Sequence, residues 1–284
     1  MKLLRFDDGG KARLGVAQGE NIIPLDALAS EYPTMLSIID GGAAALARIS
    51  DVVAKATDGI PLASAKLLAP VERPGKYLAI GMNYAKHVAE ADKLGVARSA
   101  HQVWFNKQTT CLNSPFGEIE PGNTEKLDYE VELGLVIGNR AKNVSQADAL
   151  DCVFGYFVAN DFSARDFQFH SQTMTMGKSF DTHGPIGPWI VTADEVADPQ
   201  ALGLRCIVNG EQRQSSNTDN MIHSIAAQIA YLTSAFTLEP GDLIATGTPE
   251  GVGVGMEPQV FLKPGDIVRC EIDSIGMIEN RVAG

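Results

Sequence analysis

A run of alternating apolar and polar positions stands out at residues 128–138, which read DYEVELGLVIG. The apolar positions of this run are Tyr129, Val131, Leu133, Leu135 and Ile137. Strict alternation over this length predicts a β-strand with one apolar face. The opposite face carries Glu130 and Glu132, whose side chains a strand places about 6 to 7 Å apart on the same side.

Two like charges this close repel each other, and the pair has two interpretations. Glu130 and Glu132 can lie on the solvated face of a half-exposed strand, as polar residues of antiparallel sheets commonly do. Alternatively, the two carboxylates converge on a cation, which relieves the repulsion between them. The pattern of this segment alone leaves both interpretations open.

The first part of the chain has the pattern of a small separate domain. Short strand-like segments (KLLRF, RLGVAQ and NIIPL) are divided by Gly-rich turns, and residues 34–55 favour a helix. Prolines then punctuate the stretch 61–74, as they do in linkers. We therefore predict a small N-terminal α+β domain at residues 1–65 and a larger domain at residues 66–284.

The larger region consists mostly of short strand patterns separated by turn signals. Asn209-Gly210 reads as a tight hairpin turn, and two Pro-Gly-Asp turns, at 240–242 and 264–266, each precede a strand. Helical patterns occur at residues 145–150 and 220–236. Many short strands with few helices predict an α+β fold that is predominantly β, in the form of a sandwich or a barrel.

Composition and charge narrow the classes of function. The 284 residues are 45% hydrophobic and 20% charged, and the formal net charge of −12 argues against nucleic acid and anionic membrane surfaces as partners. The sequence has no apolar run long enough to predict a membrane span. The scattered cysteines predict no disulfide framework, and Asp7 and Asp8 interrupt any signal-like opening, so we expect a cytoplasmic protein.

A third carboxylate, Asp161, follows the apolar run GYFVAN, which predicts a buried strand. An Asp at such a strand end often begins a turn or caps a helix. Here, however, Arg165, Asp166, Gln168 and the segment GKSFD follow closely in the sequence. So many polar groups around one buried strand end are costly unless they serve a site.

Seven segments give the sequence a family likeness. They are AIGMNYAKHVAEA, FNK, DYEVELGLVIG, NDFSARDFQ, GKSFD, GPIGPW and TGTPEGVG, in this order. Together they resemble the fumarylacetoacetate hydrolase family, and in particular its acylpyruvase-like branch. The resemblance implies a mixed β-sandwich roll of the fumarylacetoacetate hydrolase type, preceded by a small N-terminal domain. It also implies a homodimer, since members of the family are commonly homodimers.

The same resemblance implies a metal site. In the family, the E-x-E strand and the Asp of the N-D-x-S-A-R-D segment hold one divalent cation, which here implies Glu130, Glu132 and Asp161 as ligands. Carboxylates without sulfur or imidazole suit a hard cation, for which we expect Mg²⁺, with Mn²⁺ or Ca²⁺ as substitutes. Under this interpretation the cation relieves the repulsion between the two glutamates.

The resemblance also implies catalytic residues. Lys178 lies in the catalytic G-K-S-F string, and His87 and Glu90 lie on one helical face of a segment, residues 84–103, that looks like a lid whose His–Glu pair activates water. The residues expected to bind substrate are Tyr84, Lys107, Arg165, Gln168, Thr246 and Thr248. The segment TGTPEGVG lacks the G-K-[ST] ending of a phosphate loop and is expected to line the substrate site.

These expectations combine into a metal-dependent hydrolase that cleaves a carbon–carbon bond in acylpyruvate-like 2,4-dioxo acids and releases pyruvate and a carboxylic acid. The expected partner is therefore a small anionic 2-oxo acid. A decarboxylase, lyase or isomerase of a related acid such as oxaloacetate stays open, because these reactions use the same metal residues. A non-catalytic cation-binding protein is the alternative from another class, and it would leave Lys178 and the His87–Glu90 pair without a role.

Overall fold

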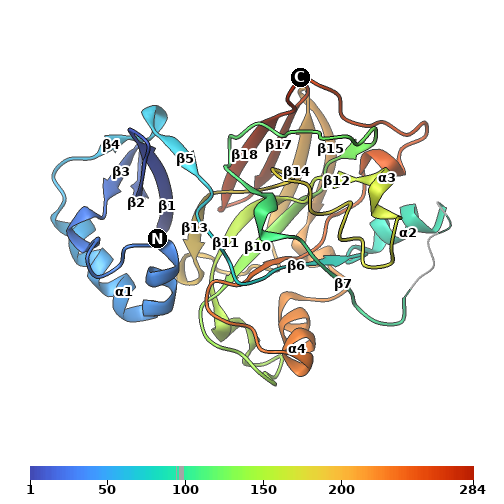
Figure 1. The fold of residues 1–284 in the computed structure, drawn as a ribbon. Coiled ribbons are helices and arrows are strands. Elements are labelled where there is room, and N and C mark those ends of the chain that lie inside the picture. The colour runs from blue at the N-terminus through green and yellow to red at the C-terminus, as the bar shows by residue number, and fades with distance from the viewer. Residues whose placement is uncertain (94, 96–98) are drawn as a thin grey trace.

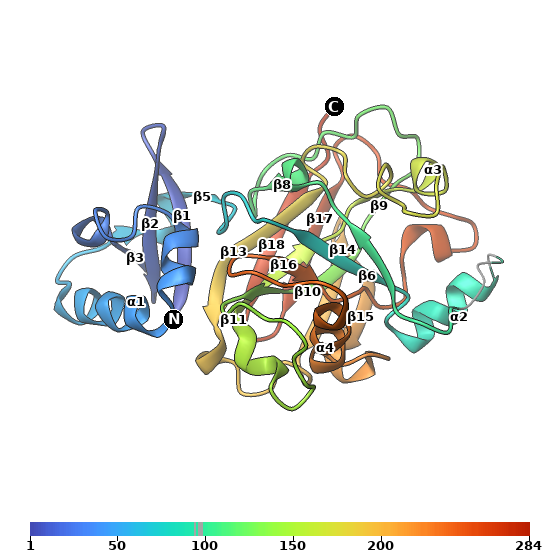
Figure 2. The ribbon, with the colours of Figure 1, turned by 60° about the horizontal axis from the view of Figure 1, so that its bottom comes forward.

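The computed structural model describes residues 1–93, 95 and 99–284. Two units lie side by side in both ribbon views, a small one built from the N-terminal residues and a larger one that carries the C-terminus (Figure 1, Figure 2). The α-helices of the described residues are α1 (Met35–Lys55), α2 (Ala85–Lys93), α3 (Arg165–Gln168) and α4 (Ile225–Ala235). Within the described part of the chain, none of the helices combines the length and apolarity that crossing a membrane requires.

The small unit packs α1 against one layer of strands. The strands are β1 (Lys2–Asp8), β2 (Lys11–Gln18), β3 (Asn21–Pro24), β4 (Ile60–Pro61) and β5 (Lys66–Leu68). Thr34 caps α1, because its hydroxyl accepts a hydrogen bond from the Ser37 amide at 3.0 Å and its amide donates to the Ser37 hydroxyl at 3.0 Å. The buried face of α1 comprises Met35, Ile38, Ile39, Ala45 and Ile49. The helix predicted at residues 34–55 is therefore confirmed, with one interruption at Gly42, whose positive φ of 51° is not helical.

β1 connects the small unit with the larger one. It pairs with β2 and β5 inside the small unit, and its first residues, Lys2 and Leu3, pair with β13 (Gly184–Thr192). One sheet therefore runs through both units. The predicted domain boundary after residue 65 falls just before β5, and it stays a prediction.

The larger unit is built around β10. Beyond β13 the sheet continues in the order β11, β10, β16, β6 and β7, and β8 pairs with β13 off this path. The bounds are β6 (Tyr77–Gly81), β7 (Val103–Asn106), β8 (Leu112–Asn113), β10 (Val131–Ile137), β11 (Val153–Asn160) and β16 (Leu243–Ala245). The strand order has two ends, so the sheet is open and does not close into a barrel.

A second sheet packs against one face of the first. Its strands, in spatial order, are β15 (Glu211–Asn217), β14 (Gly203–Val208), β17 (Ile267–Ile272) and β18 (Gly276–Arg281). One hydrophobic core joins Leu135 and Val158 of the first sheet with Leu204, Val268 and Ile278 of the second. A short pair, β9 (Leu127–Asp128) with β12 (Ser163–Ala164), belongs to neither sheet. Two sheets that share a core confirm the predominantly β, sandwich-like fold.

β10 lies in the middle of the large sheet, and all 7 of its residues are buried. The prediction of a single apolar face is therefore wrong for this strand. Leu133 and Leu135 belong to the core between the two sheets, whereas Val136 belongs to a second core. β11 and β16 pair with the two edges of β10. Glu132 consequently lies in a buried environment, and the interpretation of a solvated acidic face is wrong.

Two predicted helices differ from the structure. In place of the helix predicted at residues 145–150, a turn at 146–148 leads into a 3-10 helix at Ala149–Cys152. The Ser145 hydroxyl donates to the Asp148 carboxylate at 2.6 Å, and the Asp148 amide donates to that hydroxyl at 3.3 Å, so this segment closes a local turn. The helix predicted at residues 220–236 is shorter, because Ser224 caps α4 and sets its start at Ile225.

The predicted turns are confirmed. Asn209 and Gly210, both with positive φ, connect β14 with β15. In each Pro-Gly-Asp turn the Asp amide donates to the carbonyl three residues earlier at 3.0 Å, as a β-turn requires. These turns set the entry into β16 and β17.

Leu135→Ala tests how far the fold depends on β10. Leu135 is fully buried, so its truncation should lower the free energy of unfolding by about 2 to 5 kcal/mol, through lost burial and the cavity that is left. Denaturant unfolding measures this difference. The matched control is Leu150→Ala, an exposed leucine for which we expect a change below about 0.5 kcal/mol. Equal effects of the two substitutions would contradict the central position of β10.

Candidate active site

Three carboxylates converge where β10 begins and β11 ends. Glu130 directly precedes β10, Glu132 is its second residue, and Asp161 directly follows β11. The antiparallel pairing of Val131 with Asn160 brings these ends together. The Asp161 amide donates to the Glu130 carbonyl at 2.9 Å, and the Glu130 amide donates to the Asn160 side chain at 2.9 Å. One ligand oxygen from each carboxylate lies within 4.8 Å of the others, and all three residues are buried.

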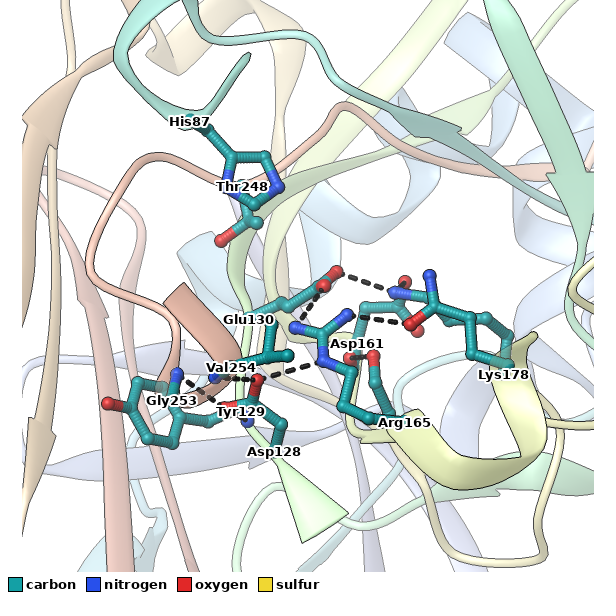
Figure 3. Close-up of polar contacts among 12 residues, drawn as sticks. His87, Asp128, Tyr129, Glu130, Asp161, Arg165, Lys178, Thr248, Gly253 and Val254 are labelled. Atoms are coloured by element: carbon teal, nitrogen blue, oxygen red, sulfur yellow. Dashed lines mark hydrogen bonds and ion pairs between the residues drawn. The ribbon is translucent and has the colours of Figure 1, made fainter. Parts of the chain in front are cut away.

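Two lysines neutralise part of this negative charge. Lys178 Nζ lies between two of the carboxylates, 2.7 Å from Glu130 Oε2 and 2.8 Å from Asp161 Oδ2 (Figure 3). Lys107 Nζ donates to Asp161 Oδ1 at 2.5 Å and to the carbonyls of Lys178 and His183 at 2.6 and 3.3 Å. Both lysines are buried, so carboxylates and carbonyls take the place of water around their ammonium groups.

Arg165 and Asp128 extend this network. Arg165 Nε donates to Asp128 Oδ2 at 2.8 Å, and Nη2 forms an ion pair with Glu130 Oε1 at 2.8 Å (Figure 3). Nη1 donates to Gln168 Oε1 at 2.9 Å. The Arg165 guanidinium is therefore fixed by three side chains. The sequence did not single out Asp128, because an acidic residue ahead of an E-x-E strand carries no signal of its own.

The surroundings shift the pKa values of the two glutamates in opposite directions. Burial disfavours the charged form of Glu130, but Lys178 and Arg165 outweigh this effect and lower its pKa to about 2. Burial raises the pKa of Glu132 well above its ordinary value, and the charges of Asp161 and Glu130 raise it further. A cation beside Glu132 would oppose that rise. The buried oxygen donors and their excess negative charge therefore fit a divalent cation.

The charge of the whole cluster also bears on its ligands. Its members are the carboxylates of Asp128, Glu130, Glu132 and Asp161 and the cations Lys107, Arg165 and Lys178. With every group ionised the cluster carries one net negative charge, which a divalent cation converts into one positive charge. Hard oxygen donors of this kind suit Mg²⁺, Mn²⁺ or Ca²⁺. A loaded site would then attract a small anion.

A cavity of about 360 Å³ opens beside the carboxylates, a size usual for small-molecule sites. The predicted site residues that line it are His87, Glu90, Glu130, Glu132, Arg165, Gln168, Lys178 and Thr248. Apolar side chains also line it, among them Val88, Phe105, Met174, Ile222 and Val254. The structure thus brings most of the predicted residues to one cavity.

α2 carries His87 and Glu90 into the cavity lining. His87 Nδ1 lies 3.2 Å from Glu90 Oε2, so the two side chains form a pair. Glu90 Oε1 accepts a hydrogen bond from the Gly251 amide at 2.9 Å, which ties α2 to the TGTPEGVG segment. The predicted lid at residues 84–103 falls in part, at 94 and 96–98, outside the described residues.

The other predicted substrate-binding residues lie behind the lining. Lys107 directs its ammonium at a carboxylate and two carbonyls, as described above. The Thr246 hydroxyl donates to the Leu133 carbonyl at 2.8 Å, and Tyr84 is buried and forms a β-bridge with Met221. Direct substrate contact by Tyr84, Lys107 and Thr246 stays a prediction.

His183 is a further buried residue that the sequence did not single out. Its ring stacks on Phe180 with 5.1 Å between centroids, and Nε2 lies 2.9 Å from the Glu120 carbonyl oxygen. Its own carbonyl accepts from Lys107 Nζ. Burial disfavours the imidazolium and lowers the pKa of His183 to about 4, an effect that the Glu120 carbonyl only partly offsets. Neutral His183 therefore packs behind the site.

Comparison with known proteins identifies relatives of both units. Residues 76–283 match the family described as fumarylacetoacetate (FAA) hydrolase C-terminal, and residues 1–70 match the one described as Rv2993c-like, N-terminal. The mitochondrial oxaloacetate tautomerase of Xenopus laevis is 41% identical over 290 residues, which cover 99% of this chain and 90% of that protein.

Solved structures of similar proteins also cover both units of the chain. The maleylpyruvate hydrolase from Sphingobium sp. SYK-6, solved with manganese (II) ion and pyruvate, is 32% identical and superposes with a TM-score of 0.84, covering 100% of this chain and 99% of that one. The 2-hydroxyhepta-2,4-diene-1,7-dioate isomerase from Mycobacterium marinum is 31% identical, with a TM-score of 0.76 and coverage of 100% and 98%. These likenesses confirm the predicted fold type, and they span hydrolases, isomerases and tautomerases.

His183 predicts a specific dependence of stability on pH. The unfolded chain has an ordinary histidine pKa near 6.5 and therefore binds more protons than the folded chain between about pH 4 and 6.5. The free energy of unfolding should therefore rise as the pH increases across this window, by roughly 3 kcal/mol at most. Acidification through the same window should remove this stabilisation. His183→Gln keeps an N–H donor for the Glu120 carbonyl, removes the titration and should flatten this slope.

Denaturant unfolding at several pH values measures the His183 effect. His170→Gln, at an exposed histidine, is the matched control for the effect of the substitution itself. A slope that persists in His183→Gln would assign the pH dependence to other groups.

Proposed function

The chain is a member of the fumarylacetoacetate hydrolase family, and on that premise we propose that it is a metal-dependent hydrolase of acylpyruvate-like 2,4-dioxo acids. The reaction cleaves the bond between carbons 3 and 4 and releases pyruvate and a carboxylic acid. One observation carries the proposal: the His87–Glu90 pair lines the same cavity as Glu130, Glu132 and Lys178. A base that can activate water therefore faces a site that suits a cation and an anionic ligand.

Glu130, Glu132 and Asp161 are the proposed ligands of the cation. When bound, a divalent cation supplies positive charge that attracts the substrate carboxylate and polarises its 2-oxo group. We propose Mg²⁺, and the relative solved with manganese supports a hard divalent cation of this kind. Lys107 and Lys178 reduce the negative charge that would otherwise repel the substrate.

His87 is placed to take a proton from the attacking water. Because Nδ1 faces Glu90 Oε2, Nε2 is the nitrogen left to accept that proton. The Glu90 carboxylate then stabilises the imidazolium, while the Gly251 amide holds Glu90 in place. In the view of Figure 3, His87 lies above Glu130, and Arg165 lies below it.

The protons and electrons of the proposed reaction balance. The water oxygen attacks the carbonyl carbon at position 4 as His87 takes the water proton. The bond between carbons 3 and 4 then breaks, its electron pair stays with the pyruvate part, and His87 returns the proton to carbon 3. The acyl carbon departs as a carboxylic acid that carries the water oxygen. The ammonium of Lys178, which lines the cavity, stabilises the negative charge that develops on the pyruvate part.

Keto–enol tautomerisation of oxaloacetate is a second candidate function. A His–Glu pair can transfer a proton to or from carbon 3 without attack by water, so the pairing of His87 with Glu90 serves this reaction too. The 41% identical protein of Xenopus laevis carries this activity in its name. Decarboxylase, lyase and isomerase reactions of related 2-oxo acids draw on the same residues and remain alternatives.

Three further parts of the proposal carry over expectations drawn from the sequence. α2, the described helical part of the expected lid, covers the cavity, and the hydrogen bond between the Gly251 amide and Glu90 holds it there. The protein is a homodimer, as members of the family commonly are. It works in the cytoplasm, a location that the scattered cysteines support.

Glu132→Gln tests the proposed cation site. The substitution keeps the size of the side chain but removes one ligand charge, so calorimetry should show Mn²⁺ binding weakened by at least about tenfold. Asp166→Asn is the control, because Asp166 bonds to Thr124 and Glu125 and stands outside the triad, and it should bind Mn²⁺ as the wild type does. Unchanged Mn²⁺ affinity in Glu132→Gln would rule out this ligand set.

His87→Ala tests the general base. Pyruvate release from an acylpyruvate should fall by about 10² to 10⁴, the usual contribution of a general base, with little change in KM. His101→Ala removes another histidine from the lining of the same cavity and should keep most of the turnover. Equal losses in the two variants would mean that His87 has no special role in proton transfer.

The wild type separates the two candidate functions. Pyruvate release from acetylpyruvate and the disappearance of enol-oxaloacetate are measured side by side, with and without added Mg²⁺. Mg²⁺-dependent pyruvate release is the expected result. Rapid conversion of enol-oxaloacetate with no cleavage of acetylpyruvate would instead establish the tautomerase.

A further inference from the structure

Asp128 is fully buried, and both of its carboxylate oxygens accept hydrogen bonds. Oδ1 accepts from the amides of Tyr129 at 2.9 Å and Gly253 at 2.7 Å. Oδ2 accepts from the Val254 amide at 3.0 Å and from Arg165 Nε at 2.8 Å. One carboxylate thus joins the chain just before β10, the TGTPEGVG segment and Arg165 (Figure 3).

On one side, the contacts of Asp128 lead to the proposed cation site. Arg165, held by Asp128, pairs through Nη2 with Glu130 Oε1 at 2.8 Å. The other oxygen of Glu130 accepts from Lys178 at 2.7 Å. The position of the Glu130 carboxylate therefore depends in part on an arginine that Asp128 and Gln168 hold in place.

On the other side, the contacts lead to the proposed base. Residues 251–254, here called the 251–254 turn, bond to Asp128 at one end and to Glu90 at the other. The Gly251 amide donates to Glu90 Oε1 at 2.9 Å, and the Tyr129 hydroxyl donates to the Gly251 carbonyl at 3.1 Å. Glu90 in turn pairs with His87. A displacement of this short turn at Asp128 would therefore reach the His87–Glu90 pair.

The 251–254 turn has little room to absorb such a displacement. A Cβ atom at Gly253 would lie 2.0 Å from the Val260 carbonyl oxygen and 2.7 Å from Asp128 Oδ1. The absence of a side chain thus allows the Gly253 amide to approach the carboxylate. In such close packing, a displacement of the Asp128 carboxylate also moves the residues of the turn that contact it.

We propose that Asp128 is a positioning residue that couples the Glu130 side of the site to the His87–Glu90 pair through the 251–254 turn. A cation at the triad fixes Glu130, and with it Arg165, Asp128 and the turn. The coupling works in both directions, because a free-energy linkage between two sites is reciprocal. Its kinetic consequence rests on the proposed reaction, whereas the coupling itself rests only on the proposed cation site.

A purely structural role for Asp128 is the competing explanation, because removal of any buried charged group destabilises a fold. Asp242 provides the matched control. It is also fully buried, and its Oδ2 accepts from Lys76 Nζ at 2.6 Å and from the Glu239 amide at 2.8 Å. Asp242 lies just before β16, and it is not among the described residues that line the cavity.

Hydrogen exchange on Asp128→Asn, with Mn²⁺ as the probe, tests the coupling without any turnover. Asn keeps the shape, but its NH₂ group faces two N–H donors whichever way it turns. In the wild type, Mn²⁺ should slow exchange in peptides covering α2 and the 251–254 turn by at least about fivefold, the lower end of usual couplings between sites. In Asp128→Asn, Mn²⁺ should still bind, and this protection should disappear.

Turnover provides a second readout. In Asp128→Asn, kcat should fall by at least about tenfold with little change in KM, because the base is misplaced while substrate binding is retained. Asp242→Asn should lose stability as well, yet keep both the Mn²⁺-dependent protection and the kcat of the wild type.

The outcomes separate the inference from the proposed function. Three outcomes overturn the coupling. The Mn²⁺-dependent protection from exchange persists in Asp128→Asn, or Asp242→Asn loses it equally, or the wild type does not show it. Protection that Asp128→Asn alone loses supports the coupling, even if no variant hydrolyses a 2,4-dioxo acid. In that case the proposed function fails and the coupling stands.

Discussion

Repulsion among three buried carboxylates is the constraint on which the rest of the site depends. The junction of β10 and β11 places Glu130, Glu132 and Asp161 in one region, where little water is present to screen their charges. Buried charges without partners are strongly destabilising, so cations must accompany them. Lys178 contacts two of these carboxylates, and the excess negative charge that remains is what a divalent cation would neutralise.

This constraint changes the role of the basic residues. The sequence suggested Lys107 and Arg165 as substrate contacts, whereas the structure pairs them with Asp161, Asp128 and Glu130. Through these contacts, Lys107 and Arg165 hold the carboxylates in place. Because the net charge of the cluster becomes positive only with a divalent cation, the site would attract a small anion only after a cation is bound.

Local signals in the sequence predicted most local structure correctly, and they said less about how each element packs. The cap of α1 and the turn at Asn209 need only neighbouring residues, and both predictions are confirmed. The alternation of β10 marked a strand correctly, but Val136 packs into a second core, so the face opposite the apolar one is not solvated. At residues 145–150, the structure has turns and the start of a 3-10 helix in place of the expected α-helix.

The sequence by itself pointed to the carboxylate pair and the His–Glu pair, because the spacing within each pair brings its two side chains to the same side of an extended segment or of a helix. Glu130 and Glu132 lie two residues apart, and His87 and Glu90 lie three apart. Only the tertiary structure decided what Asp128 does, since its partners Arg165 and Gly253 lie 37 and 125 residues away. Periodicity states which face of an element a residue occupies, and it carries no information about which distant residue packs against that face. For Asp128, the pairing of β9 with β12 brings Arg165 near, and the fold of the chain brings the 251–254 turn to the same carboxylate.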